Sequence, residues 1–259
     1  MGMNKSVDIL GVSKIFSLDS GDLPVLGKSD FHIESGEFVS IVGRSGCGKS
    51  TLLRIISGLE IATTGEVQIG GRRVERPSVL TGLIFQEPRL FPWLTVEKNI
   101  EFGLHRKIEK TQRREVVEQH IALVGLSGFE EAFPRQLSGG MQQRVSIART
   151  LINQPNVLLL DEPFGALDAL TRIHMQNEIL QIWEAEGSTM ILVTHDVDEA
   201  IFLSDRIIVL SDRPGEIKKV ISVDTSRPRD RSGPRFMEIR REIYTEFFED
   251  SSLSIEYYV

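Results

Sequence analysis

The residues with the clearest chemical meaning form a glycine-rich loop at positions 43–51, Gly-Arg-Ser-Gly-Cys-Gly-Lys-Ser-Thr. It follows an apolar run at 38–42 and leads into a helical run at 52–56, the strand, loop and helix order in which this spacing binds phosphate. Its glycines let main-chain N–H groups point inward, and the helix N-terminus adds partial positive charge. Lys49 can then reach the β and γ phosphates of a nucleotide, and Ser50 can ligate Mg²⁺.

Two carboxylates close a second chemically suggestive stretch. Asp161 and Glu162 follow the four apolar residues at 157–160, the pattern of a central parallel strand buried on both faces. Asp161 can hold Mg²⁺, directly or through water, and Glu162 can accept a proton from an attacking water. Paired acids at a strand end are usually only solvated, but a phosphate loop in the same chain favours the catalytic interpretation.

Three further polar positions carry weaker signals. Gln86 ends the short apolar run at 81–85, where its amide could touch Mg²⁺ or a water, although an ordinary loop glutamine is the commoner meaning. Residues 138–140, Ser-Gly-Gly, open a helix and could form a second anion site, although a plain N-cap is commoner. His195 ends the buried run at 189–194, and no second histidine or cysteine lies at a zinc-ligand spacing from it.

The elements that must position these residues predict an α/β fold with a mostly parallel sheet core. Alternating apolar residues at 7–12 and 29–33 predict an antiparallel β subdomain at the N-terminus. Residues 95–150 are helical in character with no convincing strand, so we expect an α-helical subdomain inserted into the core. Within it, Thr111 can cap a helix and Gly125 can end it.

Apolar residues recur at helical spacing near the C-terminus, at Phe236, Ile239, Ile243 and Phe247. This pattern predicts an amphipathic helix that docks on the core. We therefore expect a nucleotide-binding domain at 1–235 and a C-terminal helix and tail at 236–259.

Composition narrows the function classes. With 41% hydrophobic and 26% charged residues, the 259-residue chain is ordinary for a globular protein. A net charge of −7 argues against generic nucleic-acid binding, so no nucleic-acid partner is expected. No apolar stretch approaches the roughly 18 residues of a membrane helix, and the N-terminus lacks the apolar run of a signal peptide. We expect a cytoplasmic protein, and the single cysteine, Cys47, suits a reducing compartment.

Taken in order along nearly the whole chain, these motifs resemble the ATP-binding cassette (ABC) family of transporter ATPases. The resemblance implies a P-loop NTPase (RecA-like) core. The motifs that carry it are the Walker A loop at 43–50, the Q-loop glutamine Gln86, the signature motif at 137–143, Walker B at 157–162, the D-loop at 166–168 and the switch histidine His195.

The resemblance also implies roles. Two cassettes would close head to tail, with ATP between the Walker motifs of one and Ser138 and Gly140 of the other. Glu162 would act as general base, Lys49 and Mg²⁺ would stabilise charge, and His195 would contact the γ phosphate. Phe16 looks like a core aromatic on the residues alone, whereas the resemblance implies that it stacks on adenine.

The predicted site draws on residues of all these motifs. The predicted catalytic residues are Glu162, His195, Lys49 and Gln86. The predicted Mg²⁺ ligands are Ser50, Gln86 and Asp161. The predicted ATP contacts are Phe16, Gly43, Arg44, Ser45, Gly46, Cys47, Gly48, Lys49, Ser50, Thr51, Ser138, Gly139, Gly140 and Asp168.

A narrower resemblance, at 88–96, 169–172, 194–206 and 213–215, is to importers of the nitrate, sulfonate and taurine type. It implies a motor subunit that forms a homodimer on binding ATP. It would sit peripherally on the cytoplasmic face of the inner membrane and drive anion uptake through a separate membrane permease, fed by a solute-binding protein. The solute itself is not encoded in this chain.

Other functions stay open at this point. An importer ATPase for another solute would carry the same motifs. A non-transport cassette acting on DNA or the ribosome would usually carry two cassettes or a long coiled coil. A simple P-loop kinase would leave the segment 137–144 unexplained.

Overall fold

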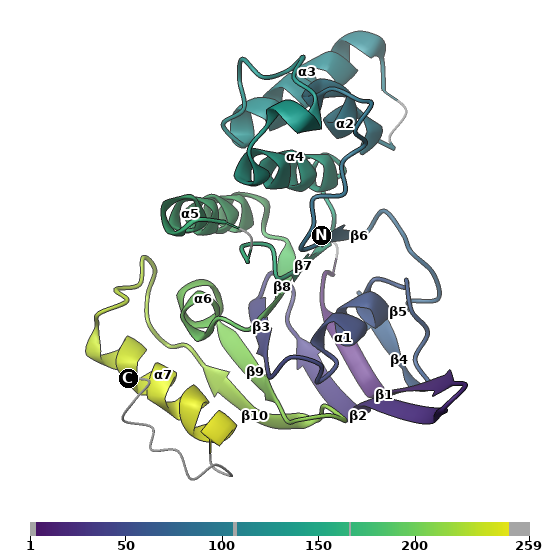
Figure 1. Cartoon of the computed structure of the whole chain (residues 1–259), viewed down its shortest axis with the longest axis vertical. Coiled ribbons are helices and arrows are strands. Elements are labelled where there is room, and N and C mark those ends of the chain that lie inside the picture. Colours follow the sequence, from purple (N-terminus) through teal and green to yellow (C-terminus); the bar gives the residue numbers. More distant parts are fainter. Residues whose placement is uncertain (1–3, 106–107, 166, 249–259) are drawn as a thin grey trace. The chain divides into compact units, whose positions relative to one another are not determined.

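A computed structural model of the chain describes residues 4–105, 108–165 and 167–248 (Figure 1). These residues divide into two compact units. The first takes in the described residues up to 77 and from 189 onward, and the second those of 78–188. The chain therefore leaves the first unit and later returns to it.

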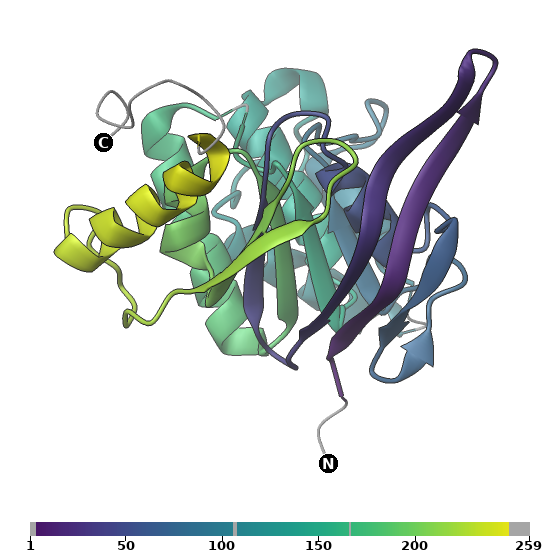
Figure 2. The same ribbon diagram turned by 90° about the horizontal axis from the view of Figure 1, so that it is seen from below.

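An antiparallel sheet opens the first unit. Its strands are β1 (Val7–Leu18), β2 (Gly21–Ile33), β4 (Thr64–Ile69) and β5 (Arg72–Arg73), in the order β2-β1-β4-β5. The long hairpin of β1 and β2 is the purple pair in Figure 2. This confirms the predicted N-terminal β subdomain. The strands run beyond the predicted segments because register shifts after Ile9 interrupt the alternation without ending the pairing.

The second sheet of the first unit carries the strands that precede the phosphate loop and His195. In this unit its order is β10 (Ile217–Ser222), β9 (Arg206–Leu210), β3 (Phe38–Val42) and β8 (Thr189–Thr194). β3 runs parallel to both β8 and β9, whereas β10 is antiparallel to β9. Every residue of β3 and β8 is buried, as expected for central parallel strands.

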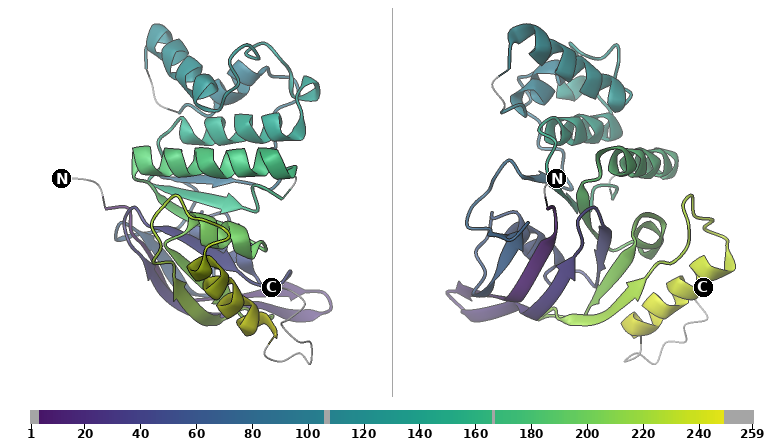
Figure 3. Two further views of the ribbon diagram at one scale, coloured as in Figure 1. Left: turned by 90° about the vertical axis from the view of Figure 1, so that its left-hand side faces the viewer. Right: turned by 180° about the vertical axis from the view of Figure 1, so that it is seen from behind.

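Three helices belong to the first unit: α1 (Lys49–Ile56), α6 (Val197–Leu203) and α7 (Pro234–Phe248). α7 is the amphipathic helix that the sequence predicts, and Phe236, Ile239 and Ile243 are at most 3% exposed. It lies beside α6 and β10 and is yellow in both views of Figure 3. The sequence pattern did not predict α6.

The second unit pairs two parallel strands, β6 (Thr81–Ile84) and β7 (Val157–Asp161). Its helices are α2 (Val96–Phe102), α3 (Lys110–Leu123), the short 3₁₀ helix η1 (Pro134–Gln136), α4 (Gly139–Leu151) and α5 (Ala169–Glu186). The described residues of 95–150 hold helices and no strand, which confirms the expected helical segment.

One predicted helix boundary is correct and another is wrong. Gly125 follows the end of α3 with a φ of +64°, as predicted. Thr111 does not cap α3, because the helix begins one residue earlier and Glu109 holds the N-cap position without a side-chain hydrogen bond. Within the described ranges, no helix has both the length and the apolar character needed to cross a bilayer.

Candidate active site

The phosphate loop depends on glycine at two positions. Gly46 and Gly48 have φ angles of +83° and +103°, a region that side chains rarely adopt. A Cβ atom on Gly48 would lie 2.6 Å from the side chain of Leu26 and 2.9 Å from the main-chain oxygen of Val25. The loop therefore packs closely on β2 immediately before α1 begins.

Lys49 is the first residue of α1 and is only 5% exposed. Its ammonium donates hydrogen bonds to the main-chain oxygens of Gly43, at 2.8 Å, and Arg44, at 3.0 Å. A buried charge needs such partners. The lysine side chain is thus held inside the loop that the sequence predicts to bind phosphate.

Cys47 is part of this loop and is 1% exposed. Burial raises the pKa of its thiol, and the positive charge of Lys49 opposes that rise. A Cβ atom on Gly43 would meet the Cys47 sulfur at 2.8 Å. The Cys47 side chain therefore packs within the loop, and its main-chain N–H donates to the Arg44 oxygen at 3.3 Å.

Arg44 ties the loop to the C-terminal helix. Its guanidinium donates to the main-chain oxygen of Phe247 in α7 at 2.9 Å and pairs with Asp212 at 3.3 Å. The arginine was predicted only as a nucleotide contact. The link to α7 had no local signal, because the two residues are far apart in the sequence.

His195 lies next to the phosphate loop in the register of the sheet. Thr194, at the end of β8, pairs with Val42, at the end of β3. Gly43 and His195 therefore leave the sheet side by side, at the edge where ligands of parallel α/β sheets bind. His195 is exposed at this edge.

Asp196 fixes the turn after His195. Its carboxylate caps α6 by accepting from the N–H groups of Asp198 and Glu199, at 2.9 and 3.1 Å. The hydroxyl of Thr194 donates to the Glu199 carboxylate at 2.8 Å and accepts from the Asp196 N–H at 3.0 Å. Hydrogen bonds thus hold the chain on both sides of the histidine.

Phe16 is partly exposed, so the core interpretation is wrong. Its β2 partner is Leu23, and the Lys14 ammonium lies 4.6 Å from its ring centre. Leu23 stands only a few residues before Val25, the residue that approaches Gly48. Phe16 and the phosphate loop therefore both lie next to β2, and stacking on adenine stays a prediction.

In the second unit, Gln86 and the two carboxylates follow neighbouring strands. Ile84 of β6 pairs with Leu160 of β7, so Gln86 and Glu162 lie at corresponding positions beyond the strand ends. Asp161 is 9% exposed, and Glu162 has a φ of +47°. Non-glycine residues held in this left-handed region are uncommon and cluster at functional sites.

The predicted signature residues begin α4. Ser138 caps the helix by accepting from the Met141 N–H at 3.3 Å, and Ser138 and Gly139 are exposed. A Cβ atom on Gly140 would meet the Thr171 side chain of α5 at 2.9 Å.

Asp168 caps α5 beside this contact by accepting from the Thr171 N–H at 3.1 Å. Hydrogen bonding to Thr171 lowers the pKa of the Asp168 carboxyl. Asp168 thus stays ionised as a cap close to the signature segment.

Two residues of α4 that the sequence analysis missed hold the loop after β6. Gln143 donates to the Phe85 oxygen at 3.2 Å. Arg149 donates to the oxygens of Arg89 and Pro88, both at 3.0 Å, and burial lowers the pKa of its guanidinium. Polar residues on the buried side of a predicted helix were the available signal. The helix that begins with the signature residues therefore also holds the Gln86 loop.

In the first unit, His195 thus leaves the sheet beside the phosphate loop, and Phe16 lies next to β2, on which the loop packs. In the second unit, Gln86 lies across from Glu162 beyond two paired strands, and the signature segment lies separately, beside the Asp168 cap. In the described ranges, no group of three or more histidine, cysteine, aspartate or glutamate residues is placed to hold a metal by itself. Ser50 in the first unit, and Gln86 and Asp161 in the second, each carry an oxygen donor of the type that Mg²⁺ takes alongside phosphate and water.

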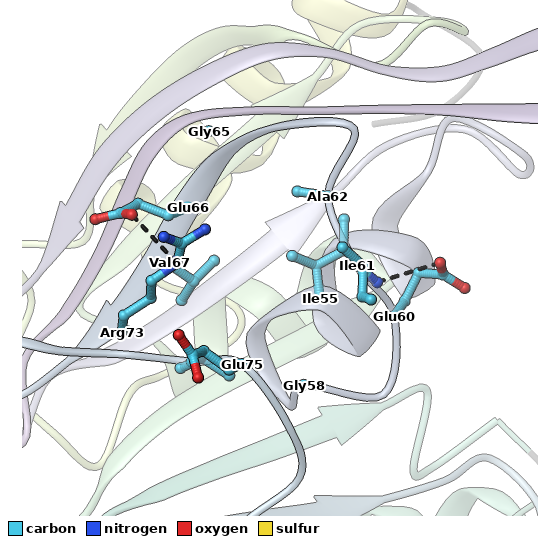
Figure 4. A pocket seen from close by; sticks show the side chains of 11 residues that line it. Ile55, Gly58, Glu60, Ile61, Ala62, Gly65, Glu66, Val67, Arg73 and Glu75 are labelled. Carbon is cyan, nitrogen blue, oxygen red and sulfur yellow. Dashed lines mark hydrogen bonds and ion pairs between the residues drawn. The ribbon is translucent and has the colours of Figure 1, made fainter.

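A separate hollow of about 230 Å³ lies between α1 and β4 in the first unit. Figure 4 shows Ile55 and Ile61 on one side and Glu66 and Arg73, joined by an ion pair at 3.3 Å, on the other. None of the predicted site residues lines it.

Residues 26–165 match the protein family described as ABC transporter. An aliphatic sulfonates import ATP-binding protein, SsuB, of Bacillus cereus (strain ATCC 10987) is 51% identical over 242 residues, which span 93% of this chain and 96% of that protein. The SsuB protein of Bacillus subtilis (strain 168) is 48% identical over 240 residues, covering 93% of each chain.

Among solved structures, the chain is similar to the ATP-binding cassette MJ0796 in a dimeric post-hydrolysis state bound to ADP and phosphate. The TM-score is 0.76 at 34% identity, with 85% of this chain and 100% of that one covered.

Proposed function

The chain belongs to the ABC transporter family, and from this premise we propose that it is the motor subunit of an importer for sulfonates or a related small anion. ATP is its substrate, and hydrolysis of ATP to ADP and phosphate drives transport. The observation that carries the choice of solute class is the 51% identity to a sulfonate import subunit along nearly the whole of both chains.

The binding step uses groups of the first unit. In the proposed complex, the N–H groups of the phosphate loop and the start of α1 surround the phosphates, and Lys49 exchanges its loop carbonyls for phosphate oxygens. Phe16 stacks on the adenine ring, and His195 contacts the γ phosphate. The register of β3 and β8 supports the last assignment, because it sets His195 beside the loop.

The hydrolytic step uses groups of the second unit. Glu162 takes the proton of the attacking water, and Gln86, at the corresponding position on the next strand, orients that water. Ser50, Asp161 and Gln86 would hold Mg²⁺, which supplies charge stabilisation for the phosphates. The backbone strain at Glu162 supports a role that fixes its carboxylate in one direction.

A second copy of the chain completes the site in this proposal. Ser138 and Gly139 are exposed at the start of α4, and with Gly140 they offer hydroxyl and N–H groups that can meet phosphate. The dimeric state of the similar cassette bound to ADP and phosphate supports closure of two copies.

An aromatic cluster in the second unit suits contact with a permease. Phe91 lies 5.5 Å from Trp93 and 4.6 Å from Phe102, measured between ring centres. Trp93 and Phe102 are 69% and 58% exposed. Exposed apolar clusters of this kind mark interaction sites. We infer that it receives an apolar segment of the permease at the cytoplasmic face of the membrane.

The proposal is tested by purifying the chain with its permease and reconstituting both in vesicles with the solute-binding protein. We expect ATP hydrolysis to rise when the binding protein carries an alkanesulfonate, and less or not at all with nitrate. If a different solute stimulates hydrolysis, the proposed solute class is wrong and the proposed motor role stands. Co-purification with ribosomes or nucleic acid instead of a permease would favour a non-transport cassette.

A further inference from the structure

The C-terminal helix α7 touches both segments of the first unit that face the proposed nucleotide. Near its end, the Phe247 oxygen accepts from Arg44 of the phosphate loop at 2.9 Å. Near its middle, Arg240 pairs with Asp198 of α6 through two hydrogen bonds, at 2.7 and 2.6 Å. Figure 3 shows α7 alongside α6 in both views.

The Arg240 pair reaches His195 in two short steps. Asp198 lies in the first turn of α6, and its N–H donates to the Asp196 carboxylate at 2.9 Å. Asp196 directly follows His195 in the chain. The guanidinium therefore fixes the helix turn whose cap ends the histidine segment.

The burial and geometry of the Arg240–Asp198 ion pair suit it to fix the first turn of α6. The side chains of Arg240 and Asp198 are 18% and 36% exposed, so solvent screens them less than a surface pair. Both carboxylate oxygens of Asp198 accept from the guanidinium, and such fork geometry fixes orientation as well as distance. Arg240 and Tyr244 also line a hollow of about 410 Å³ together with His195.

We propose that Arg240 is a positioning residue for ATP hydrolysis, acting through Asp198 on the turn that presents His195. This inference rests on the proposed ATPase function. Because Arg240 acts through Asp198 in this proposal, its loss should change the turnover step and leave nucleotide binding by the phosphate loop in place.

The test compares Arg240→Met with Arg235→Met in the full chain. Methionine keeps an unbranched apolar stem and removes the guanidinium. Arg235 is the matched control, because it lies on the same helix and also pairs with a carboxylate, Asp224, at 2.9 Å. Steady-state ATP hydrolysis gives kcat and KM for each variant, and thermal unfolding reports stability.

We expect Arg240→Met to lower kcat about five- to tenfold with KM changed less than about twofold, whereas Arg235→Met stays close to wild type. Asp198→Asn should lower kcat similarly, and the double variant should be no worse than either single one, because both act through one contact. Asp198→Asn also tests the pair if Arg240→Met fails to fold.

Equal kcat values for both arginine variants, or independent effects of Arg240 and Asp198, would overturn the positioning role while leaving the motor function intact. A wild-type chain that hydrolyses no ATP would instead overturn the proposed function, and this inference with it.

Discussion

The ammonium of Lys49 lies 2.8 Å from the main-chain oxygen of Gly43, the first residue of the same loop. The cation and the carbonyls it holds are therefore part of the loop's own structure. A ligand that draws the ammonium to itself must offer stronger acceptors than two main-chain oxygens, and phosphate oxygens meet that requirement.

Lys49→Met should weaken ATP binding by about a hundredfold or more, because it removes a charge aimed at the phosphates. Titration with a fluorescent ATP analogue measures the affinity. Lys28→Met serves as the control, since Lys28 is an exposed lysine on β2 of the same unit. Equal affinities for both variants would contradict the proposed phosphate site.

Glu162→Gln should lower ATP turnover by about 10²- to 10⁴-fold, because glutamine cannot accept the proton of the attacking water. ATP-bound dimers should accumulate, and light scattering with and without ATP detects them. The exposed Glu131→Gln variant controls for loss of a carboxylate in the same unit. Unchanged phosphate release by Glu162→Gln would remove the general-base assignment.

Ser138→Ala should lose both a helix cap and a phosphate contact. Thr95 is a matched cap, because its hydroxyl accepts from the Lys98 N–H of α2 at 3.3 Å, the distance found from Ser138 to Met141. Either alanine variant should cost about 0.5–2 kcal/mol in the free energy of unfolding. Only Ser138→Ala should also lose ATP-driven dimerisation, as measured by light scattering. Loss of dimers in both variants would mean that the cap alone matters.

Cys47 should react slowly with maleimide near neutral pH. The thiolate is the reactive form, and a raised pKa leaves less thiolate at a given pH than in a free cysteine. The labelling rate should therefore increase as the pH rises through that pKa, and bound ATP should slow it. Intact-protein mass spectrometry follows the reaction, with the unfolded chain as the fast reference. A rate equal to that reference at neutral pH would contradict the buried position.

Elements with strong local patterns were predictable from the sequence. The apolar runs of β3, β7 and β8 have no polar alternation, because parallel strands in the interior are covered on both faces. The helix α1 follows from the glycine loop, and α4 follows from the cap at Ser138. The fold class and the order of the motifs could be deduced from such segments.

Elements held by distant residues were not predictable in the same way. α6 has only seven residues, and Arg229 donates to the oxygens of Ile201 and Phe202 at its C-terminal end. Arg240 holds its other end through Asp198. A short helix of this kind depends on tertiary contacts more than on its own propensity, so a local pattern gives little sign of it.

The same distinction, between local sequence patterns and contacts of distant residues, applies to the candidate site. The residue types of the phosphate loop and the acid pair predicted their chemistry, but the contact of Arg44 with Phe247 joins residues 203 positions apart in the sequence. The sequence therefore predicts which residues face a nucleotide and leaves open what supports them. Their individual roles remain predictions for the variants above to test.

The pairing of β3 determines how late in synthesis this strand can join its sheet. Its ladder partners are β8 and β9, so Val42 meets Thr194 and Val209 only after the whole of 78–188 has been translated. Pairing between such distant segments is slow, because a long loop must close before the contacts form. A ribosome that has made only the first half of the chain therefore carries an apolar strand without its sheet. The nucleotide loop can take its final shape only when the strands after 188 have emerged.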